Sequence, residues 1–97
     1  MKKYVIERPI PGVGSLTRDA LHFESTRSCC ALEELGPDIQ WVHSYVTDDK
    51  IYCVYLAANE QLIRQHAERT TFPAATISTV RAIIDPTMRL SPIGAAA

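Results

Sequence analysis

The sequence predicts an α+β domain whose elements follow the order β-α-β-β-α-β. Three features support this order: a hairpin pattern at residues 40–56, a helical pattern on each side of it, and an apolar strand pattern near each end of the chain. Right-handed crossovers then give a four-stranded antiparallel sheet in the order 4-1-3-2, with both helices on one face. This is the split βαβ, or ferredoxin-like, arrangement.

The hairpin is the strongest local pattern in the chain. β-Branched and aromatic residues, which suit strands, fill both of its halves, and the turn-forming run Thr-Asp-Asp-Lys at residues 47–50 separates them. A two-residue turn and a four-residue turn both place Val46 opposite Ile51. An uninterrupted register then pairs Val42 with Tyr55.

Alternation of side chains along the two strands divides the hairpin between two faces of the sheet. Both faces are apolar, so we expect both to be covered. Helices of the same chain cover one face, and a second copy or a ligand cavity covers the other. The register assigns to the helix-free face the residues that are predicted to line a ligand-binding cavity: Trp41, His43, Tyr45 and Tyr52. Two such faces packed together would form a dimeric α/β barrel.

The first strand and first helix are bounded by punctuating residues. The strand is expected at residues 2–8, and the prolines and glycines of residues 9–14 end it. The helix is expected to begin at Ser15 or Thr17, because either hydroxyl can cap free backbone N–H groups. It is expected to end at Leu35, where a Gly-Pro pair follows.

The second helix and the last strand follow the hairpin. Asn59 is expected to cap the helix, and the Phe-Pro pair at residues 72–73 to end it. Residues 75–84 have the apolar pattern of a final strand. A single ferredoxin-like domain is therefore predicted at 1–86. Residues 87–97, rich in small residues and proline, are predicted to form a flexible C-terminal tail.

Composition excludes several classes of function. The 97-residue chain has ten basic and eleven acidic residues, which gives no basic footprint for nucleic acid, and no apolar run reaches membrane-spanning length. The first residues, Met-Lys-Lys-Tyr-Val-Ile, lead directly into a strand pattern and do not resemble a signal peptide. Three cysteines without a Cys-X-X-Cys pair are expected to be small, buried thiols in a reducing cytoplasm.

Several segments carry a resemblance to a known family. They are YVIER at residues 4–8, the turn with Gly12 and Gly14, LEELG at 32–36, the hairpin at 40–55, and IRQHA at 63–67 with the following Phe-Pro-Ala and a valine- and isoleucine-rich strand. In these segments the chain resembles small bacterial proteins of unknown function, some of them described as nickel-responsive or nickel-binding. The resemblance implies a ferredoxin-like homodimer and the binding of a divalent metal such as nickel. It implies no organic cofactor.

Three residues are the candidate metal ligands: His66, His22 and Glu7. His66 lies on the apolar stripe of the second helix, where it is either an imidazole ligand or a hydrogen-bonded core residue. His22 lies one residue off the stripe of the first helix, which is also compatible with an exposed side chain. Many relatives have a His in the first strand, where this chain has Glu7. Many also have a His pair on the second helix, where this chain has His66 and Thr70. For both imidazoles to be ligands, helix-side carboxylates such as Glu7 or Glu24 would have to converge on them.

Three functions are compatible with these residues. The first is a small cytoplasmic homodimer, joined through the helix-free face, that binds a divalent metal. The second is a small-molecule-binding module, or a cofactor-free isomerase or monooxygenase-like enzyme, that uses a barrel cavity around His43, where a His can act as acid or base. The third is an interaction dimer without chemistry. The sequence alone does not distinguish an enzyme from a binding protein.

Overall fold

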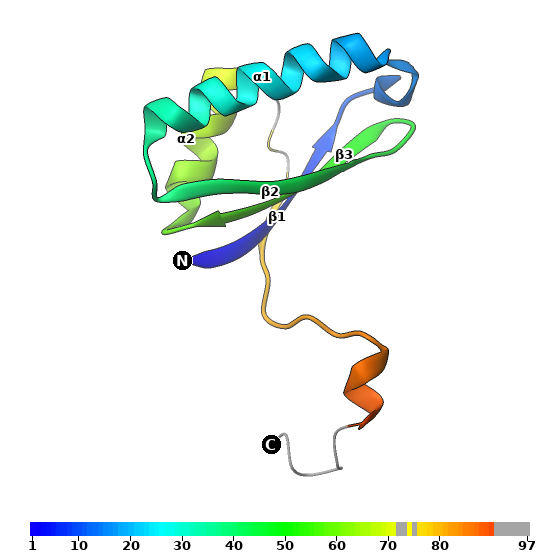
Figure 1. Ribbon diagram of the computed structural model, residues 1–97, viewed down its shortest axis with the longest axis vertical. Helices are drawn as coiled ribbons and strands as arrows, with labels where there is room; N and C mark the ends of the chain where they lie inside the picture. Colours follow the sequence, from blue (N-terminus) through cyan, green and yellow to red (C-terminus); the bar gives the residue numbers. More distant parts are fainter. Residues whose placement is uncertain (72–73, 75, 91–97) are drawn as a thin grey trace.

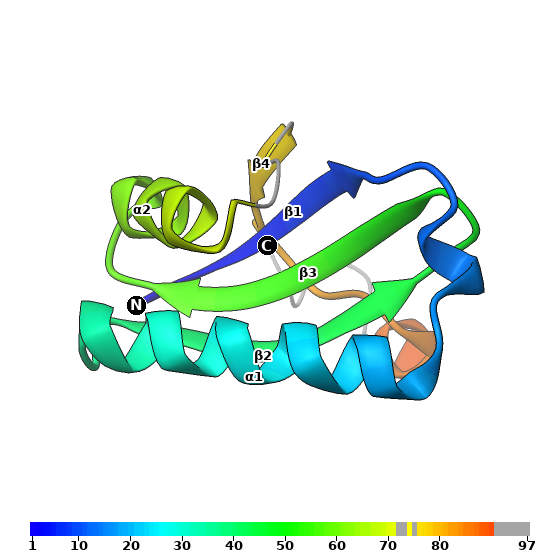
Figure 2. The same ribbon diagram turned by 90° about the horizontal axis from the view of Figure 1, so that it is seen from above.

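The computed structural model describes residues 1–71, 74 and 76–90 of the chain. The predicted element order is confirmed, with strands β1 (Lys2–Pro9), β2 (Ile39–Val46), β3 (Lys50–Ala57) and β4 (Thr76–Thr79), helices α1 (Arg18–Leu35) and α2 (Glu60–Thr70), and short 3-10 helices η1 (Val13–Ser15) and η2 (Pro86–Leu90). All strand pairs are antiparallel and the sheet order is β2-β3-β1-β4, as predicted. Both helices lie on one face of the sheet, with α1 running along β2 (Figures 1 and 2).

Both helices begin at the caps that the sequence predicts. The Thr17 hydroxyl accepts a hydrogen bond from the backbone N–H of Ala20 at 3.1 Å. The side-chain oxygen of Asn59 accepts one from the backbone N–H of Leu62 at 3.1 Å. Each bond satisfies a donor that the first turn of a helix leaves without a helical partner.

The helix ends are also stabilised by specific groups. Gly36 follows α1 with a φ of 91°, a backbone angle that favours glycine. Helix α2 ends at Thr70, whose backbone oxygen accepts a hydrogen bond from the guanidinium of Arg27 on α1. This bond ties the end of one helix to the middle of the other. The predicted stop at residues 72–73 lies outside the described residues.

The hairpin register agrees with the prediction only up to His43. Val46 pairs with Ile51, and the pairing continues in order to His43 with Val54. A β-bulge then intervenes, so that Trp41 rather than Val42 pairs with Tyr55. The predicted pairing of Val42 with Tyr55 is wrong. A bulge places an extra residue in one strand and reverses the faces of the residues beyond it, so Trp41 belongs to the helix-covered face.

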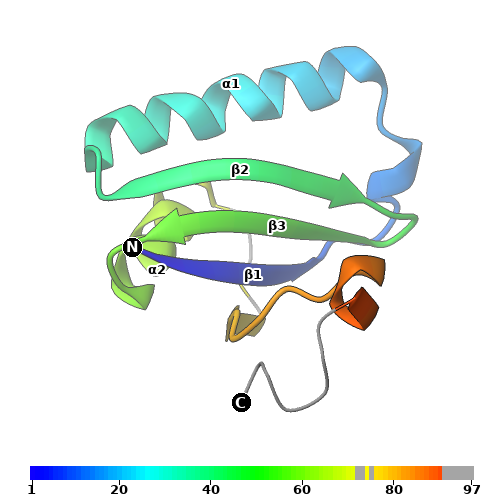
Figure 3. The same ribbon diagram turned by 60° about the horizontal axis from the view of Figure 1, so that its bottom comes forward.

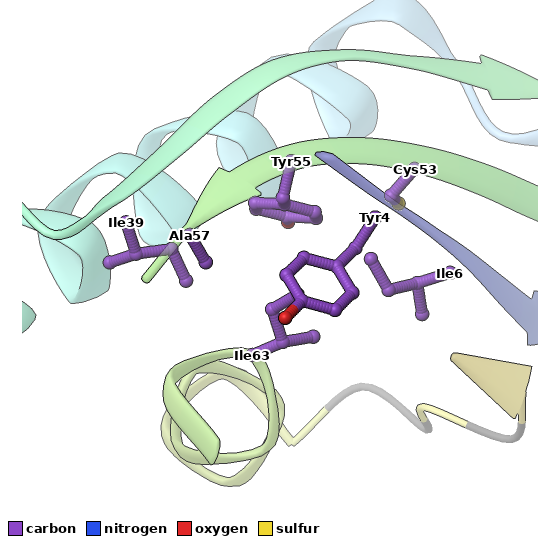
Figure 4. Packing of buried hydrophobic residues seen from close by; sticks show 7 residues of the cluster. All are labelled: Tyr4, Ile6, Ile39, Cys53, Tyr55, Ala57 and Ile63. Carbon is purple, nitrogen blue, oxygen red and sulfur yellow. The ribbon is translucent and has the colours of Figure 1, made fainter. Parts of the chain in front are cut away.

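The core lies between the helices and one face of the sheet. Figure 4 shows its central cluster, in which side chains from β1, β2 and β3 meet α2: Tyr4, Ile6, Ile39, Cys53, Tyr55, Ala57 and Ile63. Cys53 is buried as expected, whereas Cys29 and Cys30 are exposed on α1. The opposite, helix-free face carries the alternate residues of the same strands, among them Val5, Glu7, His43, Tyr45, Tyr52, Val54 and Leu56.

The last strand is much shorter than predicted. Only Thr76–Thr79 pairs with β1, whereas the sequence predicts a strand over 75–84; residue 75 lies outside the described residues. After the backbone N–H of Val80 donates to the oxygen of Lys3, the chain leaves the sheet on the side away from α1 (Figures 1 and 3). We call residues 81–90 the C-terminal arm. It contains η2, which begins at the last residue of the predicted domain and continues into the predicted tail. The remaining tail residues 91–97 lie outside the described residues.

A close backbone contact fixes the far end of the hairpin. The N–H of Gly14 in η1 donates to the backbone oxygen of Asp48 at 2.9 Å, and the N–H of Gly12 donates to the Asp49 carboxylate at 2.9 Å. A Cβ atom at Gly14 would lie 2.7 Å from the Cα of Asp48. The position therefore requires glycine, and the two acidic turn residues hold the loop that follows β1.

Candidate functional site

A cavity of about 180 Å³ lies between α1 and the helix-covered face of the sheet. Its deep end is lined by four polar residues from four different elements: Arg8 of β1, Ser28 of α1, Tyr55 of β3 and His66 of α2. All four are buried, and Arg8 and His66 are only 2% and 1% exposed. Buried polar side chains of this kind are stable only when they have polar partners.

His66 is held at both ring nitrogens. Its Nε2 lies 2.9 Å from the hydroxyl of Ser28, and its Nδ1 lies 3.5 Å from the hydroxyl of Tyr55. Burial, and secondarily the nearby charge of Arg8, lower the pKa of His66 from 6.5 to about 4. The imidazole is therefore neutral at pH 7, with one nitrogen donating a hydrogen bond and the other accepting one.

Tyr55 is a neutral phenol in the same surroundings. Burial raises its pKa to about 12, with a smaller contribution from Cys53, while Arg8 and Ser28 oppose the shift. Its ring packs against the imidazole of His66, with a centroid distance of 5.3 Å. At ordinary pH the Tyr55 hydroxyl is thus protonated and can both donate and accept hydrogen bonds inside the cavity.

Sequence reasoning missed Arg8, Ser28 and Tyr55, and Arg8 is the charged residue among them. Its guanidinium is a planar cation with five N–H donors. The signal that could have found it is the two-residue period of β1, since Tyr4 and Ile6 are buried and Arg8 follows on the same face.

Trp41 lines this cavity, so it does not belong to the predicted cavity around His43. Its Nε1 donates a hydrogen bond to the hydroxyl of Ser44 at 2.9 Å, and both residues line the cavity beneath α1. The prediction grouped Trp41 with His43 on the helix-free face. That assignment is wrong because the bulge at Val42 changes the face of every residue before it.

The other predicted cavity residues do share the helix-free face. The rings of His43 and Tyr45 meet edge to face at a centroid distance of 4.9 Å, and Tyr52 pairs with Tyr45 across the hairpin. Glu7 lies on this face too, where its carboxylate accepts a hydrogen bond from the Lys50 ammonium at 2.6 Å. The prediction that Glu7 is a helix-side carboxylate is wrong, because Glu7 pairs with Tyr52 on the helix-free face.

The family follows from comparison with known proteins. A model of the family described as "Nickel responsive protein SCO4226-like" matches residues 4–80. The chain belongs to the SCO4226-like family. The crystal structure of SCO4226 from Streptomyces coelicolor A3(2) is 15% identical, covers 84% of this chain and 99% of that chain, and superposes with a TM-score of 0.71. That likeness establishes the ferredoxin-like fold, and no curated protein sequence matches the chain.

The three predicted metal ligands of this SCO4226-like protein do not come together in one chain. His66 lies at the deep end of the cavity with both nitrogens engaged, His22 is exposed on α1, and Glu7 is on the opposite face of the sheet. Glu24, the other helix-side carboxylate that we considered, lines the cavity of His66, but so does the cation Arg8. Over residues 1–71, 74 and 76–90, no group of three His, Cys, Asp or Glu side chains could hold a metal ion. The described residues of a single chain therefore do not fit a nickel site.

Within the described part of the chain, no helix combines the length and the hydropathy that spanning a bilayer requires.

Proposed function

We propose that this SCO4226-like protein acts in a nickel response as a cytoplasmic homodimer that binds a divalent metal between its two copies. The observation that supports this most directly is that His43 and Glu7 share the helix-free face of the sheet. The family description supplies the connection with nickel. The free thiols of Cys29, Cys30 and Cys53 agree with a reducing compartment.

The helix-free face has the character of a subunit interface. This face carries Tyr52, Val54 and Leu56 of β3 together with polar residues. Tyr45 of β2 is 60% exposed there. Aromatic residues of this kind are enriched at interfaces between proteins. A second copy with twofold symmetry would cover the same face of each chain.

The C-terminal arm supports the same assembly. Ile83 and Ile84 are 67% and 77% exposed, and Met88 is also exposed, although all three are large apolar side chains. The arm extends on the side of the sheet that the helices leave open (Figure 1). In the proposed dimer, each arm lies against the partner and removes these side chains from water.

The dimer would also assemble a donor set that one chain lacks. Imidazole and carboxylate groups bind divalent transition metals, and two copies would bring two His43 rings and two Glu7 carboxylates to one interface. Glu7 would first have to leave Lys50, with which it is paired at 2.6 Å. The metal would therefore favour the dimer over the single chain.

Calorimetric titration with nickel chloride tests the metal site. We expect the unaltered protein to bind nickel more tightly than an unstructured histidine-containing peptide, with one ion shared by two chains. His43→Ala should abolish this binding and Glu7→Gln should weaken it. His22→Ala is the matched control, because His22 is an exposed imidazole on α1. Binding no tighter than that of the peptide, or equal losses in the His43 and His22 variants, would refute the metal site.

Light scattering tests the dimer independently of nickel. Val54→Lys places a charge on the helix-free face and should give a monomer at concentrations where the unaltered protein is a dimer. Phe23→Lys, at an exposed apolar position on α1, should leave the dimer intact. If the unaltered protein is monomeric, or if only the Phe23 variant dissociates, the helix-free face is not the interface.

The enzyme hypothesis requires the same dimer but a different interior. A small-molecule-binding module, or a cofactor-free isomerase or monooxygenase-like enzyme, would need an enclosed space beside His43. His43, Tyr45 and Tyr52 share a face that a second copy could close into a barrel. A crystal structure of the dimer with this space filled by partner side chains would exclude the hypothesis.

A further inference from the structure

The deep end of the cavity beneath α1 concentrates groups that recognise an oxyanion. The charged guanidinium of Arg8 lies beside the hydroxyl groups of Ser28 and Tyr55, and the neighbouring His66 is neutral at pH 7. An arginine guanidinium matches the two oxygens of a carboxylate. Neutral His66 donates to one of the two hydroxyl groups, and that hydroxyl keeps its own proton for a remaining lone pair of the ligand. A carboxylate that reached this point would exchange water for fixed donors.

The remaining charged group of the cavity restricts which anions can enter. Glu24 also lines the cavity, but its carboxylate is partly exposed and lies 3.4 Å from the guanidinium of Arg27 on the same helix. A ligand with a second carboxylate would bring like charges together near Glu24, which is unfavourable.

The lining of the cavity is otherwise largely apolar. Leu21 of α1, Val46 of β2 and Ile51 of β3 line it together with the side chain of Trp41. Binding sites for small molecules combine such apolar walls with a few polar groups that fix orientation. A volume of about 180 Å³ is suited to a body the size of one aromatic ring or a short aliphatic chain.

We propose that this cavity binds a small monocarboxylate with an apolar or aromatic body, its carboxylate on Arg8 and its body against Trp41. This site lies on the opposite face of the sheet from His43 and Glu7, so it does not depend on the proposed nickel site. Arg8 is the specificity-determining residue, because it alone among the lining groups carries a permanent positive charge.

Trp41 is the only tryptophan of the chain, so its fluorescence reports directly on the cavity. Benzoate is the probe, and we expect a saturable change in Trp41 emission at millimolar or lower concentrations. Benzyl alcohol, which has the same ring without the charge, should bind about tenfold or more weakly. Phthalate, which has a second carboxylate, should also bind more weakly than benzoate.

Two variants assign the ends of the site. Arg8→Gln should lower benzoate affinity by about tenfold or more and remove the preference over benzyl alcohol. Arg64→Gln, which removes an exposed arginine on α2, is the matched control and should leave affinity unchanged. Val46→Phe should fill the apolar part of the cavity and weaken the binding of benzoate and benzyl alcohol alike.

The outcomes separate cleanly. The absence of a saturable emission change with benzoate would overturn the proposal, as would equal affinities for benzoate and benzyl alcohol. Benzoate affinity that is equal in the Arg8 and Arg64 variants would overturn it as well. If circular dichroism shows that Arg8→Gln does not fold, the benzoate and benzyl alcohol comparison with Val46→Phe decides the matter. Unchanged binding in that variant would place the ligand elsewhere.

Discussion

The two faces of the sheet differ in how completely a single chain buries their side chains and pairs their polar groups. On the helix-covered face, Ile6 and Ile63 are completely buried, and the polar His66 has a partner at each nitrogen. On the helix-free face, Tyr45 is largely exposed and Glu7 pairs with Lys50 at the surface. One face is a packed core, whereas the other leaves large side chains exposed to water in the single chain.

Strand β1 shows how directly the sequence sets this difference. Its even-numbered residues Tyr4, Ile6 and Arg8 are buried, while Val5 and Glu7 between them are half-buried on the other side. Because side chains alternate along a strand, neighbouring residues belong to different physical environments. Matched substitutions on the two faces should therefore have very different consequences.

The largest contrast is expected between Ile63→Ala and Ile83→Ala. Ile63 is fully buried in the core cluster, so its truncation should lower the free energy of unfolding by about 2–5 kcal/mol. Ile83 is exposed on the C-terminal arm, so the same change should cost less than about 0.5 kcal/mol in dilute protein. Urea denaturation at low protein concentration measures both. Equal losses in the free energy of unfolding would contradict the division between a packed core and an exposed arm.

A smaller but diagnostic effect is expected from the protonation of His66. The folded chain holds its pKa at about 4, whereas the unfolded chain has the ordinary value of 6.5. Between these two pH values the His66 ring is mostly protonated in the unfolded chain and mostly neutral in the folded chain. Stability is therefore full above pH 6.5 and falls as the pH is lowered towards 4, by up to about 3 kcal/mol.

Urea denaturation across this pH range measures the slope. His66→Gln should be less stable near pH 7 but should lose most of the pH dependence between 6.5 and 4. His22→Gln should keep the dependence, because His22 is exposed. A slope that persists in the His66 variant would assign the proton to another group.

The sequence predicted the fold because its local signals agree with one another. The caps Thr17 and Asn59, the hairpin turn and the strand order were all found, since each depends on residue types at fixed spacing. The bulge at Val42 was not found, because no residue type there marks an inserted residue. That one position moved Trp41 from the predicted site to the other face.

The buried site was only partly predictable for a related reason. The position of His66 on the apolar stripe of α2 correctly indicated that it faces the sheet. Its partners Ser28 and Tyr55 come from distant parts of the chain, and only the packing of α1 on the sheet brings them to it. Arg8 was missed because a charged residue at the end of a strand is usually exposed.

The hydrogen bond between Ser28 and His66 provides a third test, on the helix-covered face. Ser28→Ala leaves a buried imidazole nitrogen without this partner, so we expect a loss of about 1–3 kcal/mol in the free energy of unfolding. Ser25→Ala is the matched control on the same helix, since the Ser25 hydroxyl donates only to the backbone oxygen of Leu21. It should be nearly neutral. Similar losses in the two variants would mean that the bond to His66 contributes nothing specific.

The smallest effect is expected for Glu7→Gln on the helix-free face. In a single chain, Glu7 and Lys50 form a largely solvated ion pair, which contributes little to stability and is weakened by salt. The hydrogen bond and charge of Glu7 raise the pKa of Lys50, so whatever the pair contributes is present below the ordinary pKa of lysine and is lost as the pH rises above it. Urea denaturation in dilute protein, at low and high salt, should place this variant below all of the others in effect. If it instead destabilises the protein as much as Ser28→Ala does, and increasingly so at higher protein concentration, then the pair is buried between two copies and the helix-free face is covered after all.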